Sequence, residues 1–163
     1  MSERSSKPIS ESRSGMMQLI FPSDTNYHGT MFGGKLMEYM DKIAAIASMR
    51  HARGPVVTAS TDSLDFASPI RVGDMIDVEA IVTWTHRSSM EVYVKAETEN
   101  VYTGDRKTAV TAFFSFVALD ENGRPRPVAA IVPETEEEWA LHRSAPARYE
   151  HRMQRKQDRL DKK

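Results

Sequence analysis

Residues 21–49, FPSDTNYHGTMFGGKLMEYMDKIAAIASM, contain the pattern that decides the fold. Residues 22–30 are polar and turn-forming, whereas the sequence from Leu36 on predicts an amphipathic helix. At about 100° per residue, its apolar side chains share one face, with Met37 at the edge of that face; they are Leu36, Met40, Ile43, Ala44 and Ala47. A helix with a single apolar face must bury that face against another layer.

Gly33 and Gly34 stand where this helix is expected to begin. Glycines let backbone or ligand approach closely, and the first N–H groups of a helix have no intrahelical partner. Together with the positive end of the helix dipole, such donors suit a developing negative charge.

Asp41 lies roughly 100° from the centre of the apolar stripe, so we expect it neither in the core nor fully in water. Partial burial of a carboxylate raises its pKa and makes it a better base. The alternative is a surface aspartate that pairs with a nearby lysine.

The composition excludes several classes of function. The 163 residues suffice for one domain with a core and a tail. A formal net charge of −1 gives no reason to expect bulk nucleic-acid binding. The absence of cysteine excludes a thiol nucleophile and a disulfide frame, and the five histidines lack metal-ligand spacing, so no metal is expected. His28 is the only histidine in the glycine loop, where exposure to solvent is the simpler reading.

Two further features set the expected compartment. No apolar run approaches the roughly 18 residues of a membrane span. Residues 1–15, MSERSSKPISESRSG, lack the apolar core of a signal peptide and are interpreted as a disordered leader or a short arm. We therefore expect a cytoplasmic protein with no membrane partner.

The rest of the first 132 residues predicts strands. Residues 16–21 form a short apolar run, residues 56–66 are rich in β-branched side chains, and residues 75–85 and 90–102 alternate between apolar and polar. Residues 108–119 are the most apolar segment and predict a central strand. Short breaks between the last three strands indicate antiparallel pairing. The predicted class is α+β, with a five-stranded antiparallel sheet against one long helix ending near His51.

Residues 133–163 differ in composition and predict a charged helical extension. Thr135 and Glu138 have capping-box spacing, glutamates come first and basic residues last, which matches the helix dipole, and Pro146 is expected to split the segment. A solvated helix is favoured over a nucleic-acid arm. The expected boundaries are a leader over 1–15, a domain over 16–132 and this extension.

Five segments resemble the hotdog-fold acyl-CoA thioesterases in order and spacing. They are PSDTNYHGTMFGGKLMEYMD from residue 22, VVTASTDSLDF from 56, PIRVGD from 69, HRSS from 86 and AFFSFVALDENGRPRPV from 112. The most similar group is the broad-specificity bacterial acyl-CoA hydrolases related to the animal cytosolic long-chain acyl-CoA hydrolase. The resemblance covers residues 16–132. It implies a hotdog fold with strand order 1-3-4-5-2, wrapped around one helix.

The resemblance also implies an assembly and a substrate. Family members form hotdog dimers, often arranged as trimers of dimers, so a homohexamer is expected. Their active sites lie at the dimer interface, they need no cofactor, and coenzyme A is part of the substrate.

The resemblance also implies site residues, which are the positions of this sequence that match the family's motifs. Asp41 matches the catalytic carboxylate, Gly33 and Gly34 match the glycines whose backbone donors face the thioester carbonyl, and Thr30 matches a position that holds Asn or Asp in relatives. Residues expected to meet coenzyme A are Arg87, Ser88 and Ser89, with Arg124 and Arg126 as further candidates. The acyl-chain candidates are Met37, Met40 and Phe66, for which core packing is the alternative.

The expected reaction is hydrolysis of acyl-CoA to a fatty acid and coenzyme A. Asp41 would activate water or attack the carbonyl to give a mixed anhydride, and the N–H of Gly34 would stabilise the oxyanion. Two alternatives are a non-catalytic acyl-CoA sensor, which needs no base at Asp41, and a hotdog dehydratase, whose usual catalytic histidine is missing from residues 35–50.

Overall fold

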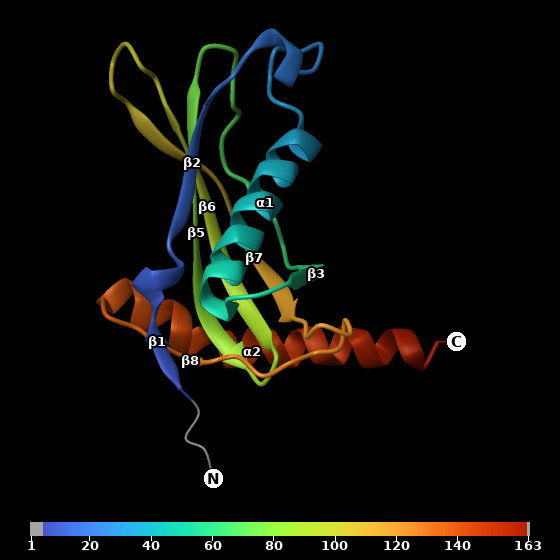
Figure 1. Ribbon diagram of the computed structural model, residues 1–163. Helices are drawn as coiled ribbons and strands as arrows, with labels where there is room; N and C mark the ends of the chain where they lie inside the picture. The colour runs from blue at the N-terminus through green and yellow to red at the C-terminus, as the bar shows by residue number, and fades with distance from the viewer. Residues whose placement is uncertain (1–4, 163) are drawn as a thin grey trace.

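The computed structural model describes residues 5–162 and shows a curved antiparallel sheet wrapped around one long helix, α1 (Figure 1). A second long helix, α2, crosses the sheet near one end. The elements are β1 (Ser6–Pro8), η1 (Ile9–Ser12), β2 (Ser14–Leu19), η2 (Pro22–Asp24), α1 (Gly33–Ala52), β3 (Val56–Thr61), β4 (Asp65–Phe66), β5 (Met75–His86), β6 (Ser89–Glu99), β7 (Arg106–Ala118), β8 (Ala130–Val132) and α2 (Glu136–Leu160).

The strand order of the main sheet is β2-β5-β6-β7-β3, with every pairing antiparallel. Numbered along the five expected strands, this order is 1-3-4-5-2, which confirms the fold that the resemblance implied. The expected strand over residues 56–66 is interrupted, because β3 and β4 pair separately with β7. The expected first strand begins two residues earlier than its apolar run, at Ser14.

The core lies between α1 and the inner face of the sheet. The predicted helical stripe is buried there, and alternate residues of β6 supply the facing layer; they are Val92, Val94 and Ala96. Their burial confirms the alternation predicted for residues 90–102 and leaves Glu91 and Tyr93 on the outer face, where α2 packs.

The expectation of a disordered leader is wrong from Ser6 on. β1 pairs in parallel with β8, and Ile9 is fully buried in the core. Lys7 Nζ donates to the carbonyl of His51 at the end of α1. Residues 1–4 lie outside the described residues. The partner strand, β8, follows more than 120 residues later, so only the tertiary fold shows this pairing.

α2 forms as expected and does not divide at Pro146. Thr135 and Glu138 make the predicted capping box. Proline removes the N–H that would normally donate to the carbonyl four residues earlier, that of His142. Ser144 Oγ lies 3.0 Å from the carbonyls of both Ala140 and Leu141, and Arg148 Nη2 donates to Leu141. The helix nevertheless runs unbroken from Glu136 to Leu160.

Candidate active site

The N-terminus of α1 opens onto free space beside Gly34. The carbonyl of Phe32 accepts from the N–H groups of Lys35 and Leu36. Within residues 5–162, the N–H groups of Gly33 and Gly34 have no hydrogen-bond partner. A Cβ on Gly33 would lie 3.1 Å from the ring of Phe66, whereas one on Gly34 would meet no atom within 4 Å. The Gly34 N–H is therefore a donor that a ligand can reach.

The loop before α1 is held by Asn26 and Thr30. Asn26 Oδ1 accepts from the N–H groups of His28 and Thr30, and the hydroxyl of Thr30 lies 3.0 Å from Asn26 Nδ2. The Thr30 hydroxyl is thus engaged inside the loop. An amide nitrogen carries two hydrogens, and one on Asn26 remains beyond its bond to Thr30. Asn26 is a candidate site residue that the sequence analysis did not single out.

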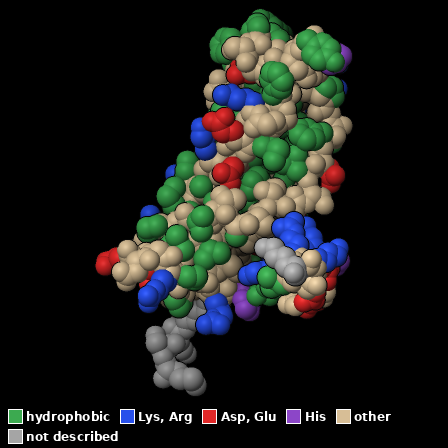
Figure 2. All heavy atoms as spheres, turned by 90° about the vertical axis from the view of Figure 1, so that its right-hand side faces the viewer, with side chains coloured by type: hydrophobic (Ala, Val, Ile, Leu, Met, Phe, Trp, Pro, Cys, Tyr) green, Lys and Arg blue, Asp and Glu red, His purple; other side chains and the backbone are tan. Residues whose placement is uncertain are grey.

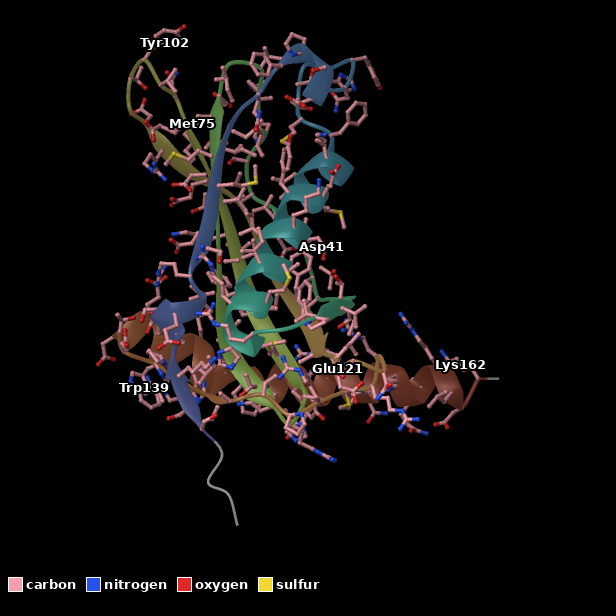
Figure 3. The ribbon with its side chains drawn as sticks, viewed as in Figure 1. Asp41, Met75, Tyr102, Glu121, Trp139 and Lys162 are labelled. Atoms are coloured by element: carbon pink, nitrogen blue, oxygen red, sulfur yellow. The ribbon has the colours of Figure 1, made fainter. Side chains whose placement is uncertain are left out.

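Asp41 is half-buried on the side of α1 that faces β3 (Figure 3), which confirms the predicted boundary position. Thr58 Oγ1 on β3 donates to Asp41 Oδ1 at 2.9 Å. Lys35 and Lys42 both pair with Glu38 instead, and within residues 5–162 no basic side chain pairs with Asp41. The aspartate is therefore held by a neutral hydroxyl and not by an ion pair.

Gly34 and Asp41 of one subunit lie too far apart along α1 to contact the same carbonyl directly. They are seven residues apart, which places them on nearly the same side of α1 but about 10 Å apart along its axis. A base or its water and an oxyanion donor must both lie within hydrogen-bond reach of one reacting group. This separation is bridged if a second subunit completes each site; otherwise the two residues belong to different sites, or the substrate or a movement of the helix spans the distance.

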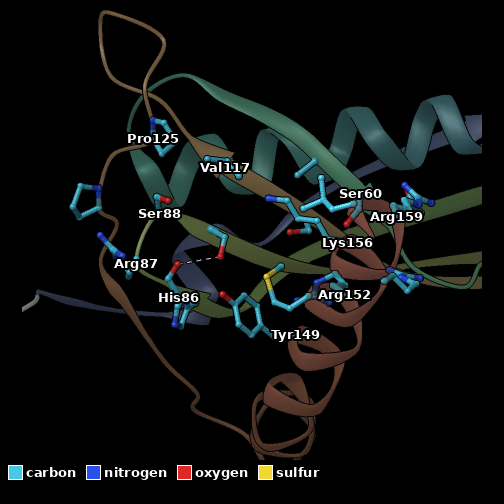
Figure 4. Close-up of a pocket in the computed structure, with 18 residues that line it drawn as sticks. Ser60, His86, Arg87, Ser88, Val117, Pro125, Tyr149, Arg152, Lys156 and Arg159 are labelled. Carbon is cyan, nitrogen blue, oxygen red and sulfur yellow. Dashed lines mark hydrogen bonds between the residues drawn. The ribbon is translucent and has the colours of Figure 1, made fainter. Parts of the chain in front are cut away.

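A cavity of about 1020 Å³ adjoins this region on the outer side of the sheet. β3, the end of β7, the β5–β6 turn and α2 form its walls (Figure 4). Ala59, Ser60 and Thr61 line it and directly follow Thr58 along β3. The lining contains no carboxylate. Its basic side chains are Arg87, Arg152, Arg155, Lys156 and Arg159.

The charges around this cavity are only partly balanced. Asp62 pairs with Arg152 and Arg155, and Glu91 also accepts from Arg152. Arg87, Lys156 and Arg159 have no carboxylate partner within the described part of the chain. Unpaired cations around a concave site favour an anionic ligand.

The β5–β6 turn carries the expected Arg87, Ser88 and Ser89 into this cavity. Arg87 has a φ of 51°, as two-residue hairpins require. Ser89 Oγ donates to the carbonyl of His86, and the Arg87 carbonyl accepts from the N–H of Val128. The structure thus brings all three residues together with the basic side chains of α2.

Two other expected coenzyme A residues lie elsewhere. Arg126 donates to the carbonyls of Ala52 and Leu119, so it caps the end of α1 and does not line the cavity. Arg124 is exposed, and its N–H donates to Asp120 within a turn. The motif predicted that these two guanidinium groups bind coenzyme A. It carries no information about the backbone contacts that the two arginines make.

The three acyl-chain candidates divide into two groups. Met40 is fully buried between α1 and the sheet, which fits core packing. Met37 and Phe66 are 41% and 56% exposed, and the ring of Phe66 lies against Gly33 at the open helix terminus. These two provide apolar surface beside the candidate site.

α1 ends at Ala52, which confirms the predicted end near His51, and it therefore includes a histidine just beyond residues 35–50. This histidine is buried at the far end of the helix, where its Nε2 lies 2.9 Å from the carbonyl of Ala129. It is therefore remote from Gly34. Among residues 5–162, no three His, Asp or Glu side chains cluster in a way that could hold a metal ion. None of the helices described is both long and apolar enough to cross a membrane.

Comparisons with known proteins place this chain among thioesterases. Residues 28–104 match the model of the thioesterase superfamily. An uncharacterized acyl-CoA thioester hydrolase of Bacillus subtilis is 54% identical over 84% of this chain and 80% of its own length. The mouse cytosolic acyl coenzyme A thioester hydrolase is 38% identical over 86% of this chain, which spans only 38% of that protein.

Two solved structures are similar along nearly the whole chain. One is a hexameric acyl-CoA thioesterase, with a TM-score of 0.91, 48% identity, and coverage of 93% of this chain and 97% of that one. The other is an acyl-CoA hydrolase of Staphylococcus aureus bound to butyryl coenzyme A, coenzyme A and its disulfide, with a TM-score of 0.92, 42% identity and 96% coverage of both chains.

Further structures of the Staphylococcus aureus enzyme carry single alanine substitutions of an asparagine, an aspartate or a threonine. That asparagine precedes the aspartate by 15 positions, and the threonine follows it by 17. The same spacings separate Asn26, Asp41 and Thr58 here. With the family model, the relatives and the fold in agreement, the chain belongs to the hotdog-fold acyl-CoA thioesterases of the thioesterase superfamily.

Proposed function

We propose that this protein hydrolyses acyl-CoA to a free fatty acid and coenzyme A. The observation that carries the proposal is the hydrogen bond between Thr58 and Asp41, together with the basic, carboxylate-free cavity that the next three residues of β3 line. Hydrolysis of a coenzyme A thioester requires a catalytic carboxylate and, close to it, a site that binds the negatively charged phosphates. The names of the relatives support this assignment.

In the proposed mechanism, Asp41 is the base that activates water. Thr58 occupies Oδ1 of Asp41 and leaves Oδ2 available to accept a proton from that water. Attack by Asp41 itself on the carbonyl, with a mixed anhydride as intermediate, uses the same geometry and remains the alternative. Both versions require the carboxylate, and neither requires a cofactor.

The oxyanion would be stabilised at the N-terminus of α1. The free N–H of Gly34 and the positive end of the helix dipole would face the thioester oxygen. The remaining amide hydrogen of Asn26 could serve as a second donor, and its spacing from Asp41 matches that of the asparagine replaced in the Staphylococcus aureus enzyme. Thr30 would then act by orienting Asn26.

Coenzyme A would place its phosphates in the basic cavity. Arg87, Lys156 and Arg159 lack carboxylate partners among the described residues, so they can pair with phosphate oxygens. The pantetheine arm would pass along β3 toward Thr58 and Asp41. The acyl chain would contact Met37 and Phe66, which are exposed near the helix terminus.

We further propose a homo-oligomer in which two subunits form each site, assembled as hotdog dimers and then as a trimer of dimers. The roughly 10 Å between Gly34 and Asp41 along α1 supports a shared site. Figure 2 shows hydrophobic side chains exposed on the face that α1 and β3 share; they include Met37, Ile46, Met49 and Val57. The hexameric relative supports the assembly, and the cytosolic mouse relative supports a cytoplasmic location.

A thiol-release assay with acyl-CoA esters of increasing chain length tests this function. We expect release of free coenzyme A from at least part of the series and a large loss in Asp41→Asn. Saturable binding of acyl-CoA without release of thiol would instead establish the sensor. Release of water from a hydroxyacyl thioester, detected as an enoyl product, would establish the dehydratase.

A further inference from the structure

Three aromatic rings gather at one end of the basic cavity. Trp84 and His86 are two residues apart on β5, and Tyr149 comes from α2. The ring centroid of Tyr149 lies 4.6 Å from that of His86 and 5.3 Å from that of Trp84. Trp84 and His86 are stacked with centroids 5.8 Å apart. His86 and Tyr149 line the cavity (Figure 4).

α2 presents different chemistry along the length of the cavity. Tyr149 and Met153 are one turn apart on the lining face, and Lys156 and Arg159 follow further along that face. From Tyr149 to Arg159 the helix rises about 15 Å. The aromatic rings thus lie at the end of the cavity where Arg87 follows His86, and Lys156 and Arg159 extend the basic lining along α2 away from them (Figure 4).

The aromatic end has a use that phosphate contacts do not explain. Phosphate oxygens need hydrogen-bond donors and positive charge, whereas ring faces bind other π systems. Coenzyme A contains a single aromatic group, its adenine. We propose, on the basis of the function proposed above, that Tyr149 and His86 hold this adenine by stacking, so that the enzyme recognises the base of its substrate as well as the phosphates.

Stacking of a base on an aromatic side chain changes affinity by about 5- to 150-fold on removal of the ring. In Tyr149→Ala we therefore expect the ratio of the KM for acyl-CoA to the KM for the corresponding acylpantetheine thioester to rise within this range. Tyr149→Phe keeps the ring and should keep the low ratio. His86→Ala removes an exposed ring from the other element and should raise the ratio in the same direction.

Binding can be measured without turnover. The chain has two tryptophans, Trp84 and Trp139, and Trp139 lies outside the cavity lining. In a Trp139→Phe background, emission therefore reports on Trp84 beside the proposed base site. We expect adenosine 3′,5′-bisphosphate to change this emission and to bind less tightly after Tyr149→Ala, whereas inorganic pyrophosphate, which has no base, should leave the emission unchanged.

Two results would overturn the proposal: equal effects of the variants on both thioesters, or equal emission changes with the bisphosphate and pyrophosphate. If Tyr149→Ala fails to fold by circular dichroism, His86→Ala decides between these outcomes. Failure of the proposed function can be distinguished from failure of the adenine site. If the protein is not a thioesterase, neither thioester releases thiol, but binding of the bisphosphate that depends on its base can still be measured.

Discussion

The hydroxyl of Thr58 donates a hydrogen bond to Oδ1 of Asp41 across 2.9 Å and thereby joins edge strand β3 to the middle of α1. Because a hydroxyl adds no charge, this contact orients the carboxylate without neutralising it. The same strand continues into the basic cavity at Ala59, Ser60 and Thr61. β3 therefore carries both the residue that orients the proposed catalytic carboxylate and part of the proposed binding site for coenzyme A.

Asp41→Asn should keep the fold and lose about 10²- to 10⁴-fold in kcat, the usual contribution of a general base. The amide has nearly the same shape and can still accept from Thr58, so the free energy of unfolding should change little. Thiol-release kinetics and urea unfolding measure the two quantities. Near wild-type turnover in this variant would exclude Asp41 both as base and as nucleophile.

Thr58→Val should lower kcat by about tenfold or more, because a hydrogen bond to a charged group contributes about 1.5–3 kcal/mol. Thr58→Ser is the matched control, since it keeps the hydroxyl and removes only a methyl group. If valine and serine variants have equal rates, the hydroxyl does not orient the carboxylate in the reacting complex.

Arg87→Ala and Lys156→Ala should raise the KM for acyl-CoA more than they lower kcat, because phosphate contacts distant from the carbonyl contribute uniform binding. Their effect should shrink at high salt. Arg143→Ala removes a charge from α2 outside the cavity and serves as control. Similar losses with acyl-CoA and acylpantetheine substrates would show that these side chains do not bind the nucleotide half.

Glu91 fixes α2 on the outer face of the sheet. Its buried carboxylate accepts from Thr83, Arg148 and Arg152. Removal of one partner from a buried ion pair costs about 3–5 kcal/mol, so Glu91→Gln should lower the urea midpoint and raise the KM for acyl-CoA as α2 loosens.

Arg106 provides the control, because it joins an exposed network with Asp77, Glu97 and Glu99. Arg106→Ala should leave the urea midpoint nearly unchanged. Equal midpoint shifts in the two variants would exclude this anchoring role.

The fold could be predicted because its signals are local. The 3.6-residue period of the apolar side chains predicted the buried face of α1 and the position of Asp41 at its edge. The alternation of apolar and polar side chains predicted β5 and β6. Thr58 appeared only as a strand residue, since its contact with Asp41 joins two elements. Asn26 was missed because loop residues follow no regular spacing in the sequence. The sequence therefore does not show which loop side chain keeps a hydrogen-bond donor available.

The same limit explains the errors on α2. Arg148 and Arg152 resemble residues of a solvated basic helix, because their partner Glu91 lies on a distant strand. Pro146 predicted a break, yet the helix continues through it while Arg148 and Arg152, on its C-terminal side, bind Glu91. Side-chain partners that are remote in sequence carry no signal in a single chain.

The last prediction is that two subunits complete each site. Gly34→Pro removes the proposed oxyanion donor at the second helical residue, where proline is tolerated, and should lower kcat by about 10²- to 10³-fold. Gly34→Ala is the matched control: it keeps the N–H, and its Cβ would enter open space. Circular dichroism must show that Gly34→Pro folds.

Mixing then tests whether Gly34 and Asp41 of different subunits act together. Asp41→Ala and Gly34→Pro should each be inactive alone. After joint unfolding and refolding, a mixed dimer would hold one site with both groups intact and one with both damaged. Random pairing would restore about a quarter of wild-type activity if the sites are independent. If mixed dimers form and no activity returns, both groups act within one subunit, and the roughly 10 Å along α1 must be bridged by the substrate or by movement of the helix.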